Sequence, residues 1–489
     1  MNINHEKAKE YFDNGNKFYQ EERFKDAESC FEKALLLVPD RLSIIENLIT
    51  TYVEQKNLDG INNLLNKTDH LKSNKEIQFG IAFREYFNKN YKLSIKLCKD
   101  IIQNFSHYEE RAQTLLVLNY YYQHDFLNSI KILKKLLKKK KDFFAYYNIG
   151  LILFRCGKIK KSFFYLKKSI ELKNNNFEAL WNFSLCCLTL SKFEIGFQLY
   201  DNRFKIKEAL EKKYQFIPEL KSLENIFNKK ILIWDEQGLG DTLNFSRFII
   251  KLLDYTEHID LVVNNKLTKL LTYLNKNIKI TNEQEVIKYQ YDYQLSLLSI
   301  PALFKIKNIK ELESPKINFQ FKDINTFSHN INSKDFNVGL CWFGNPEFLN
   351  DKFRSLNLSI FENILSIQKI KFFKLGKGLN LRDKIVYHQF NFDDLGNKDF
   401  YELSCFLPYL DFIASTDTSI IHLCGALGIK ATLLLNYNAD WRWFFDDRTT
   451  VWYPSIEILR CKRINEWKPV LEKLKIKIMD AQKIKLNKS

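Results

Sequence analysis

The stretch ILIWDEQGLGDT at residues 231–242 is typical of a β-strand that turns directly into an α-helix. Residues 231–234 form a short apolar run that suits a buried strand, and an amphipathic pattern follows Asp241. Gly238 and Gly240 permit a tight turn and let a ligand approach the backbone closely at the start of that helix. The turn lacks the third glycine of a dinucleotide fingerprint, so it does not predict NAD or FAD. Asp241 stands at the beginning of the helix, where an aspartate often serves only as a cap.

Similar apolar runs continue toward the C-terminus and alternate with helical segments. We expect strands at residues 231–234, 259–263, 338–342, 372–375, 412–414 and 432–435. Alternating strands and helices predict parallel sheets, and the two clusters of strands predict two Rossmann-like lobes. We place a connector at residues 206–228, the first lobe at residues 229–330, and the second lobe, with a C-terminal helix, at residues 331–489. Ligands of such open sheets bind beyond the carboxyl ends of the strands.

A group of polar residues follows the strand expected at residues 412–414. Thr418 and Ser419 begin a helix, where hydroxyls, backbone N–H groups and the helix dipole attract a phosphate. Asp417 would repel a phosphate, so we expect it to accept from a ribose or sugar hydroxyl, or to cap the helix. His422 can donate toward the same pocket, and a purely structural histidine is the alternative.

The first half of the chain follows a helical repeat instead. Aromatic and small residues recur at Tyr11, Gly15, Phe18, Phe24, Ala27, Phe31, Ala34 and Pro39. This is the spacing of a tetratricopeptide repeat (TPR), which has about 34 residues per helix pair. The frame returns near residues 146–169 and 184–200, so we predict an array of about six helix pairs over residues 1–205. Such arrays commonly bind peptides or partner proteins, and a rigid spacer or dimerisation surface is the alternative.

The composition is that of a globular protein in a reducing compartment. The net charge of +17 comes largely from lysines spread along all 489 residues, and the dense run at residues 134–141 suits a solvated helix face. We therefore expect no nucleic-acid partner. The nine cysteines form no C-x-x-C pair, and no histidine stands at zinc-ligand spacing, so we expect free thiols and no metal site. The N-terminus has no apolar signal region and no run is long enough to span a membrane, which predicts a cytoplasmic protein.

Four motifs together carry a family resemblance. They are residues 231–242, residues 338–346 with 350–355, residues 417–428, and residues 440–443 with 452–454. Their order resembles that of bacterial TPR proteins whose C-terminal half is similar to the heptosyltransferase-like glycosyltransferases. The resemblance covers nearly the whole chain, and the repeat that ends near Tyr200 and Arg203 is similar to the final repeat of that group.

The resemblance implies a GT-B fold without a cofactor and usually without a catalytic metal. In such a fold the first lobe binds the acceptor and the second lobe binds a nucleotide-sugar donor. Asp241 matches the aspartate that acts as the base on the acceptor hydroxyl. Arg354 falls near a basic residue that meets the donor phosphates, and an arginine fork can take two phosphate oxygens.

The donor-binding turn of that family matches the group Asp417, Thr418, Ser419 and His422. This chain departs from related sequences at Gly376, where they tend to have a glutamine before Lys-Gly, so details of donor binding differ. The identity of the sugar does not follow, because one fold serves many substrates.

These observations favour a glycosyltransferase that moves a sugar from a nucleotide-sugar to a protein or glycan hydroxyl. TPR arrays also precede the catalytic half of the protein O-GlcNAc transferases, which makes a protein acceptor conceivable. One alternative is a non-catalytic TPR interaction scaffold that carries a degenerate glycosyltransferase-like part. A sugar-phosphate epimerase of similar double-Rossmann architecture is another, and it fits the motifs less well.

Overall fold

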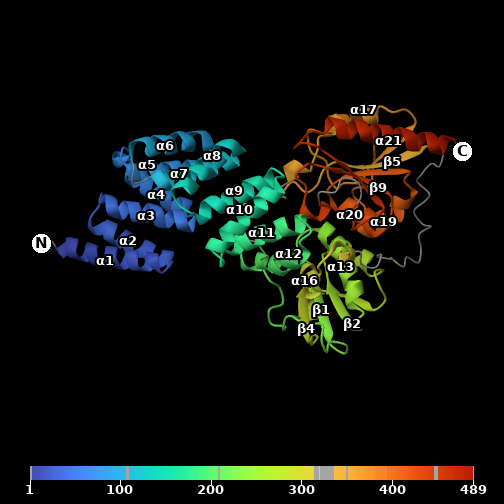
Figure 1. Cartoon of the computed structure of the whole chain (residues 1–489), viewed down its shortest axis with the longest axis horizontal. Helices are drawn as coiled ribbons and strands as arrows, with labels where there is room; N and C mark the ends of the chain where they lie inside the picture. Colours follow the sequence, from blue (N-terminus) through green and yellow to red (C-terminus); the bar gives the residue numbers. More distant parts are fainter. Residues whose placement is uncertain are drawn as a thin grey trace. The chain divides into compact units, whose positions relative to one another are not determined.

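The computed structural model describes residues 3–105, 109–206, 210–312, 319, 335–348, 351–390, 392–444 and 450–487. The chain divides into two compact units, Met1–Ile152 and Leu153–Ser489. In sequence order the helices come first and the strands follow from β1 onward (Figure 1). The division falls inside helix α9, so helical repeats contribute to both units.

The first unit consists of consecutive helix pairs. Its described elements are α1 (Ile3–Gln20), α2 (Phe24–Leu37), α3 (Leu42–Gln55), α4 (Leu58–Lys67), η1 (Asp69–Leu71), α5 (Lys75–Phe87), α6 (Tyr91–Asn104), α7 (Glu109–Tyr122), α8 (Phe126–Lys139) and the greater part of α9 (Phe143–Arg155). A Cβ atom added to Gly15 would lie 2.6 Å from the ring of Phe31, so only glycine lets α1 and α2 approach this closely. Ala27 and Phe31 are fully buried. Helix α2 ends at Leu37, before Pro39, as the repeat pattern predicts.

The second unit begins with the remaining repeat helices. These are α10 (Ile159–Leu172), α11 (Phe177–Thr189) and α12 (Phe193–Tyr200), and the 3-10 turn η3 (Asp201–Lys205) follows. Helix α11 begins after Asn176, whose side chain accepts from the backbone N–H of Ala179. Phe193, Phe197 and Tyr200 are buried in the same hydrophobic core as the strands that follow. The last repeat is therefore packed into the α/β part of the chain.

The first sheet is parallel and follows η3. Its elements are β1 (Lys230–Trp234), α13 (Leu239–Leu252), β2 (His258–Val262), α14 (Asn265–Leu271), β3 (Ile278–Thr281), α15 (Glu283–Val286), β4 (Tyr293–Ser296), η4 (Leu297–Ser299), α16 (Ile300–Leu303) and η5 (Ile309–Leu312). Within the described residues the strand order is β3-β2-β1-β4. The winding direction reverses between β1 and β4, and ligands of open α/β sheets bind at such a point.

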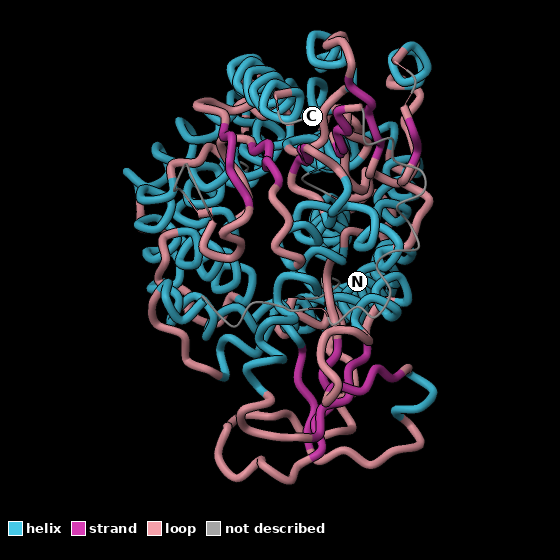
Figure 2. Tube along the Cα trace, turned by 90° about the vertical axis from the view of Figure 1, so that its right-hand side faces the viewer, coloured by secondary structure: helices cyan, strands magenta, loops and turns pink. Residues whose placement is uncertain are grey.

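The second sheet is also parallel. Its elements are β5 (Phe336–Cys341), η7 (Asp351–Phe353), η8 (Leu358–Phe361), α17 (Glu362–Leu365), β6 (Ile370–Lys374), α18 (Lys384–Gln389), β7 (Asp393–Asp394), α19 (Phe400–Phe406), η9 (Leu407–Tyr409), β8 (Phe412–Thr416), α20 (Ser419–Ala426), β9 (Ala431–Leu435), η10 (Trp441–Trp443), β10 (Ile456–Arg460) and α21 (Lys468–Leu486). Among the described strands the order is β10-β9-β8-β5-β6-β7. Numbered from β5 in chain order, this is the 3-2-1-4-5-6 order of the Rossmann fold. Figure 2 shows the strands of the two sheets as separate groups.

Successive strand residues of the second sheet face two different cores. Ile413 packs in the core that also contains residues of α19 and α20, whereas Ala414 packs in the core that contains residues of α17 and α21. Helices α17 and α21 accordingly lie over one face of this sheet, and α19 and α20 lie over the other (Figure 1). Both faces are covered, which explains why nearly every residue of β5, β8 and β9 is buried.

The predicted fold class, a helical repeat array followed by two Rossmann-like α/β sheets, is confirmed. The strands expected at residues 231–234, 259–263, 338–342, 372–375, 412–414 and 432–435 correspond to β1, β2, β5, β6, β8 and β9 within one or two residues. The sequence did not indicate β3, β4, β7 or β10. The boundary between residues 330 and 331 lies outside the described residues, and the domain limits stay predictions.

Candidate functional site

Asp241 lies in the first turn of α13, directly beyond the carboxyl end of β1. The turn between them passes through Gln237, whose backbone is left-handed with a φ of 60°, and through Gly238, the N-cap. The backbone N–H of Gly238 donates to Oδ2 of Asp241 at 2.9 Å. One carboxylate oxygen thus closes the helix end, in keeping with the structural interpretation of this residue.

The other oxygen of Asp241 faces the 3-10 turn η10, which follows β9 in the second sheet. Oδ1 lies 2.7 Å from Nη2 of Arg442, and the two side chains are 20% and 7% exposed. Nη1 of Arg442 also donates to Oδ1 of Asp440 at 2.8 Å. Burial raises the pKa of Asp241 above its usual range, and the charge of Arg442 opposes that rise. Burial thus makes the Asp241 carboxylate a stronger base, while the nearby guanidinium favours its ionised form.

His422 in α20 lies against the start of α13. A Cβ atom added to Gly240 would be 2.6 Å from Cδ2 of His422, so glycine is required for this contact between the two lobes. The Nδ1 atom of His422 is 3.0 Å from the hydroxyl of Tyr453, and its ring packs on Trp443. Burial, together with the charge of Arg442, lowers the pKa of His422 to about 3. The imidazole is therefore neutral near pH 7, and its Nε2, 3.8 Å from Oδ1 of Asp417, forms no ion pair there.

Asp417 and Arg354 lie together at the carboxyl end of β8. Nη1 of Arg354 donates to the backbone carbonyl of Asp417 at 3.0 Å, and its Nε donates to Oδ1 of Asp351 at 3.0 Å. A Cβ atom on Gly344 would be 2.6 Å from Nη2 of Arg354, so the backbone after β5 closely approaches the guanidinium. Burial, reinforced by the charge of Asp440, raises the pKa of Asp417 to about 6. Asn350, part of the motif around Arg354, lies outside the described residues.

Thr418 is the N-cap of α20, and Ser419 is the first residue of that helix. The Thr418 hydroxyl accepts from the backbone N–H of Ile420 at 3.3 Å and lies 3.0 Å from the hydroxyl of Ser415. Thr418 is buried and Ser419 is partly exposed. Ser419 and the first backbone N–H groups of α20 are thus better placed than the Thr418 hydroxyl to meet a phosphate.

The loop after β6 holds Gly376, the position that departs from related sequences. The buried Nζ of Lys374 donates to the carbonyls of Gly376 and Gly378 at 2.7 and 3.0 Å and pairs with Asp394. A Cβ atom on Gly376 would be 3.3 Å from Sγ of Cys341. The loop therefore lies beside the end of β5, on the same edge of the sheet as Arg354 and Asp417.

The residues that the sequence predicts make up only part of this cluster. Asp241, Arg354, Asp417 and His422 are predicted, and the fold brings them to facing strand ends of the two sheets. The sequence predicts no role for Arg442, Tyr453, Arg203 or Glu236. Arg442 stands between two tryptophans and Tyr453 follows Trp452. A polar side chain flanked by large aromatic residues is the local signal that could have drawn attention to both.

The described residues contain neither a metal-ion cluster nor a membrane-spanning helix. No group of three or more His, Cys, Asp or Glu side chains in that part of the chain is arranged to hold a metal ion. No helix among those residues is long and apolar enough to cross a bilayer. The absence of a cofactor stays a prediction.

Comparison with known proteins identifies the repeat. A family model for the tetratricopeptide repeat matches residues 145–176, which cover most of α9 and all of α10. The chain contains a tetratricopeptide repeat. No curated protein is significantly similar in sequence.

Solved structures similar to the chain include both classes that the sequence resemblance named. A family 9 glycosyl transferase from Veillonella parvula is 13% identical, with a TM-score of 0.38 over 54% of this chain and 99% of that one. The ADP-heptose lipopolysaccharide heptosyltransferase II of E. coli is 13% identical, with a TM-score of 0.36 over 52% and 99% of the two chains. A TPR protein from Thermus thermophilus is 15% identical, with a TM-score of 0.32 over 37% and 99%.

Proposed function

We propose that this chain is a glycosyltransferase that moves a sugar from a nucleotide-sugar donor to a hydroxyl acceptor in the cytoplasm. The observation that carries the proposal is the meeting of Asp241, beyond β1, with Arg442 and His422, from the second lobe. Two Rossmann-like sheets thereby bring a carboxylate to a cluster of basic and neutral donors at the edge where ligands bind. The carboxylate can accept the proton of a sugar hydroxyl, and the donor groups can bind the oxygens of a diphosphate.

In the proposed reaction the acceptor oxygen forms a bond to the anomeric carbon of the donor sugar. The bond from that carbon to the diphosphate oxygen breaks, and its electron pair leaves with the nucleoside diphosphate. Asp241 takes the acceptor proton, and such general-base assistance contributes about 100- to 10,000-fold. Arg354 and the N-terminus of α20, with Ser419, bind the phosphates, and the guanidinium offsets the negative charge that builds on the leaving group. No step requires a metal.

The TPR array has a separate part in the proposal. Stacked helix pairs present an extended surface that suits a peptide or a folded partner, so the array recruits a protein acceptor or a partner protein. A glycan acceptor would reach the first lobe without that contact. Removing α1 to α8 would then lower transfer to a protein acceptor but not to a small hydroxyl acceptor.

One observation favours the non-catalytic alternative. Both carboxylate oxygens of Asp241 are engaged, one by the N–H of Gly238 and one by Arg442. An interaction scaffold with a degenerate catalytic half would retain such contacts for stability alone. A glycosyltransferase binds a nucleotide-sugar in the second lobe and releases the nucleoside diphosphate, whereas an interaction scaffold does neither.

The test is a thermal-shift panel of UDP-, GDP-, ADP- and CMP-linked sugars, followed by an assay of nucleotide release. A ligand present at about 100 times its Kd adds about 2.7 kcal/mol to stability, which a melting curve resolves. A glycosyltransferase is stabilised by one donor and releases its nucleotide when an acceptor is added. A folded chain that no member of the panel stabilises would refute the proposal and leave the scaffold.

A further inference from the structure

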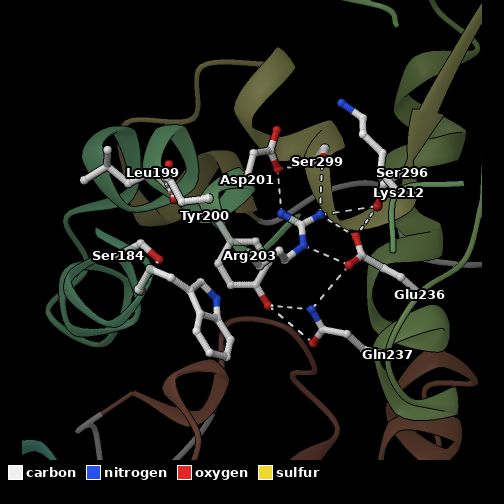
Figure 3. A network of polar contacts seen from close by, with 12 residues as sticks. Ser184, Leu199, Tyr200, Asp201, Arg203, Lys212, Glu236, Gln237, Ser296 and Ser299 are labelled. Carbon is white, nitrogen blue, oxygen red and sulfur yellow. Dashed lines mark hydrogen bonds and ion pairs between the residues drawn. The ribbon is translucent and has the colours of Figure 1, made fainter. Parts of the chain in front are cut away.

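Arg203, in the turn η3 that ends the last repeat, is at the centre of a buried polar network (Figure 3). Its side chain is 0% exposed, and that of its partner Glu236 is 3% exposed. Nε of Arg203 donates to Oε2 of Glu236 at 2.8 Å, and Nη2 donates to Oε1, so the guanidinium binds both carboxylate oxygens in a bidentate pair. Such two-point pairing fixes orientation as well as charge.

The network also includes the residues that follow β4. Nη2 of Arg203 lies 3.3 Å from the hydroxyl of Ser296 and 3.0 Å from that of Ser299. Ser296 donates to Oε1 of Glu236, and Ser299 donates to Asp201 at 2.7 Å. Strands β1 and β4 are neighbours in the sheet, so the guanidinium ties together the two strand ends between which a ligand of this lobe would bind.

Glu236 belongs to the short turn that leads from β1 to Asp241. The next residue, Gln237, is a non-glycine residue with a left-handed φ of 60°, a conformation that persists only where the surroundings impose it. Its Nε2 donates to the hydroxyl of Tyr200 at 3.1 Å. Helix α12 therefore contacts Gln237, and η3 contacts Glu236 through Arg203. Gly238 then donates to Asp241. An unbroken series of contacts therefore leads from the last repeat to the Asp241 carboxylate.

We infer that Arg203 is a positioning residue, through which the last repeat fixes the turn at residues 235–238 and thereby the carboxylate of Asp241. The expected effect on turnover rests on the function proposed above, whereas the expected effect of Arg203 on the rigidity of the turn does not. Arg203 touches no reacting atom in this scheme. Its effect is on the placement of Asp241, and loss of that placement lowers turnover without weakening the donor contacts of the second lobe.

The main variant is the double substitution Arg203→Met with Glu236→Gln, which removes both buried charges together. Replacing one partner alone would leave the other charge buried and unpaired, and would destabilise the fold for that reason alone. The control is Lys230→Met with Asp260→Asn, which removes a pair at the opposite end of β1 whose atoms are 3.3 Å apart. Hydrogen exchange is measured on peptides that cover residues 235–242, and the donor that the nucleotide-sugar panel identifies is used for kinetics.

In the folded double variant we expect amide exchange at residues 236–241 to rise at least tenfold, while β2 keeps its protection. Turnover should fall at least tenfold with the KM of the donor unchanged. The control should keep both the protection of the turn and turnover. Unchanged protection of residues 236–241 in the double variant would overturn the inference, because Arg203 would then serve stability alone.

A second variant covers the case in which the double variant does not fold. Arg203→Lys keeps the charge opposite Glu236 but cannot form the two-point contact, so it should fold and still expose the turn to exchange. Full protection of the turn in folded Arg203→Lys would also overturn the inference. If the parent chain binds no nucleotide-sugar, the proposed function fails, and the exchange measurement still decides whether Arg203 holds the turn.

Discussion

Replacing Asp241 by asparagine separates the catalytic interpretation of this residue from the structural one. The amide keeps the shape of the side chain and can still accept from the backbone N–H of Gly238, but it cannot take a proton. If Asp241 is the base, transfer should fall by about 100- to 10,000-fold. That range corresponds to about 2.7 to 5.4 kcal/mol in the activation free energy. The Kd of the donor should stay unchanged, because in the proposed site the donor is bound by residues of the second lobe.

The stability of the same variant is expected to change in the opposite direction. Burial raises the pKa of Asp241, so the folded chain binds this proton more tightly than the unfolded chain does. The stability that this carboxyl contributes is therefore fully present below its unfolded pKa and is lost as the pH rises through its folded pKa. An uncharged asparagine avoids that loss, and Arg442 is not left unpaired because its ion pair with Asp440 at 2.8 Å remains. Near neutral pH we expect the melting temperature of Asp241→Asn to equal or exceed that of the parent chain.

The assay is nucleotide release with donor and acceptor present, together with a melting curve for each variant. Glu402→Gln is a matched control, because Glu402 occupies the same N3 position of α19 and accepts from the N–H of Asp399 at 2.9 Å. We expect this control to retain turnover. Near-normal turnover of Asp241→Asn would refute the role of Asp241 as the base and leave it as a residue that closes the helix end.

Three further predictions concern the second lobe and the repeats. Arg354→Ala should weaken nucleoside-diphosphate binding by about 1.5 to 3 kcal/mol, which is the range for hydrogen bonds to charged groups. An unchanged isotherm in titration calorimetry would show that Arg354 does not bind the donor. Asp417→Asn should increase the free energy of unfolding in urea by up to about 3 kcal/mol above about pH 6, because the pKa of Asp417 is raised to about 6 from 3.8. This gain should disappear below about pH 4, where both states are protonated, and a gain that persists there would contradict the assignment. A fragment of residues 1–200 should give a helical circular dichroism spectrum, since each repeat is stabilised by its neighbours, whereas a random-coil spectrum would show that the repeats need the α/β part.

Much of the fold could be predicted because the central strands carry their signal locally. β1 contains the buried apolar run at residues 231–234 and β9 the buried apolar run at residues 433–435, and turn or helix residues delimit them. β3 and β4 were not predicted because they are short and mix apolar with polar residues, as in the Ile-Lys-Ile-Thr of β3. β7 is only the pair Asp393–Asp394 at a sheet edge, where composition says little about strand formation.

Residues of the candidate site could be predicted only where they lie within a single sequence motif. Asp417, Thr418 and His422 are neighbours in sequence, and Asp241 stands in its own glycine turn, so each could be named. The contact of Asp241 with Arg442 joins residues about 200 positions apart, and no periodicity or spacing encodes such a pair. Arg203 and Glu236 were missed for the same reason, since their pairing exists only after the last repeat has packed on the first sheet.

The burial of α12 has a consequence for engineering the chain. Phe197 and Tyr200 contact Trp441, which in turn contacts Phe245 of α13, so a single aromatic cluster joins the last repeat to both lobes. A chimera that exchanges the repeats must therefore keep its splice point before α11. Grafting a foreign array onto η3 would remove this cluster, whereas replacing only the earlier helices would preserve it and join the same α/β part to a different repeat array.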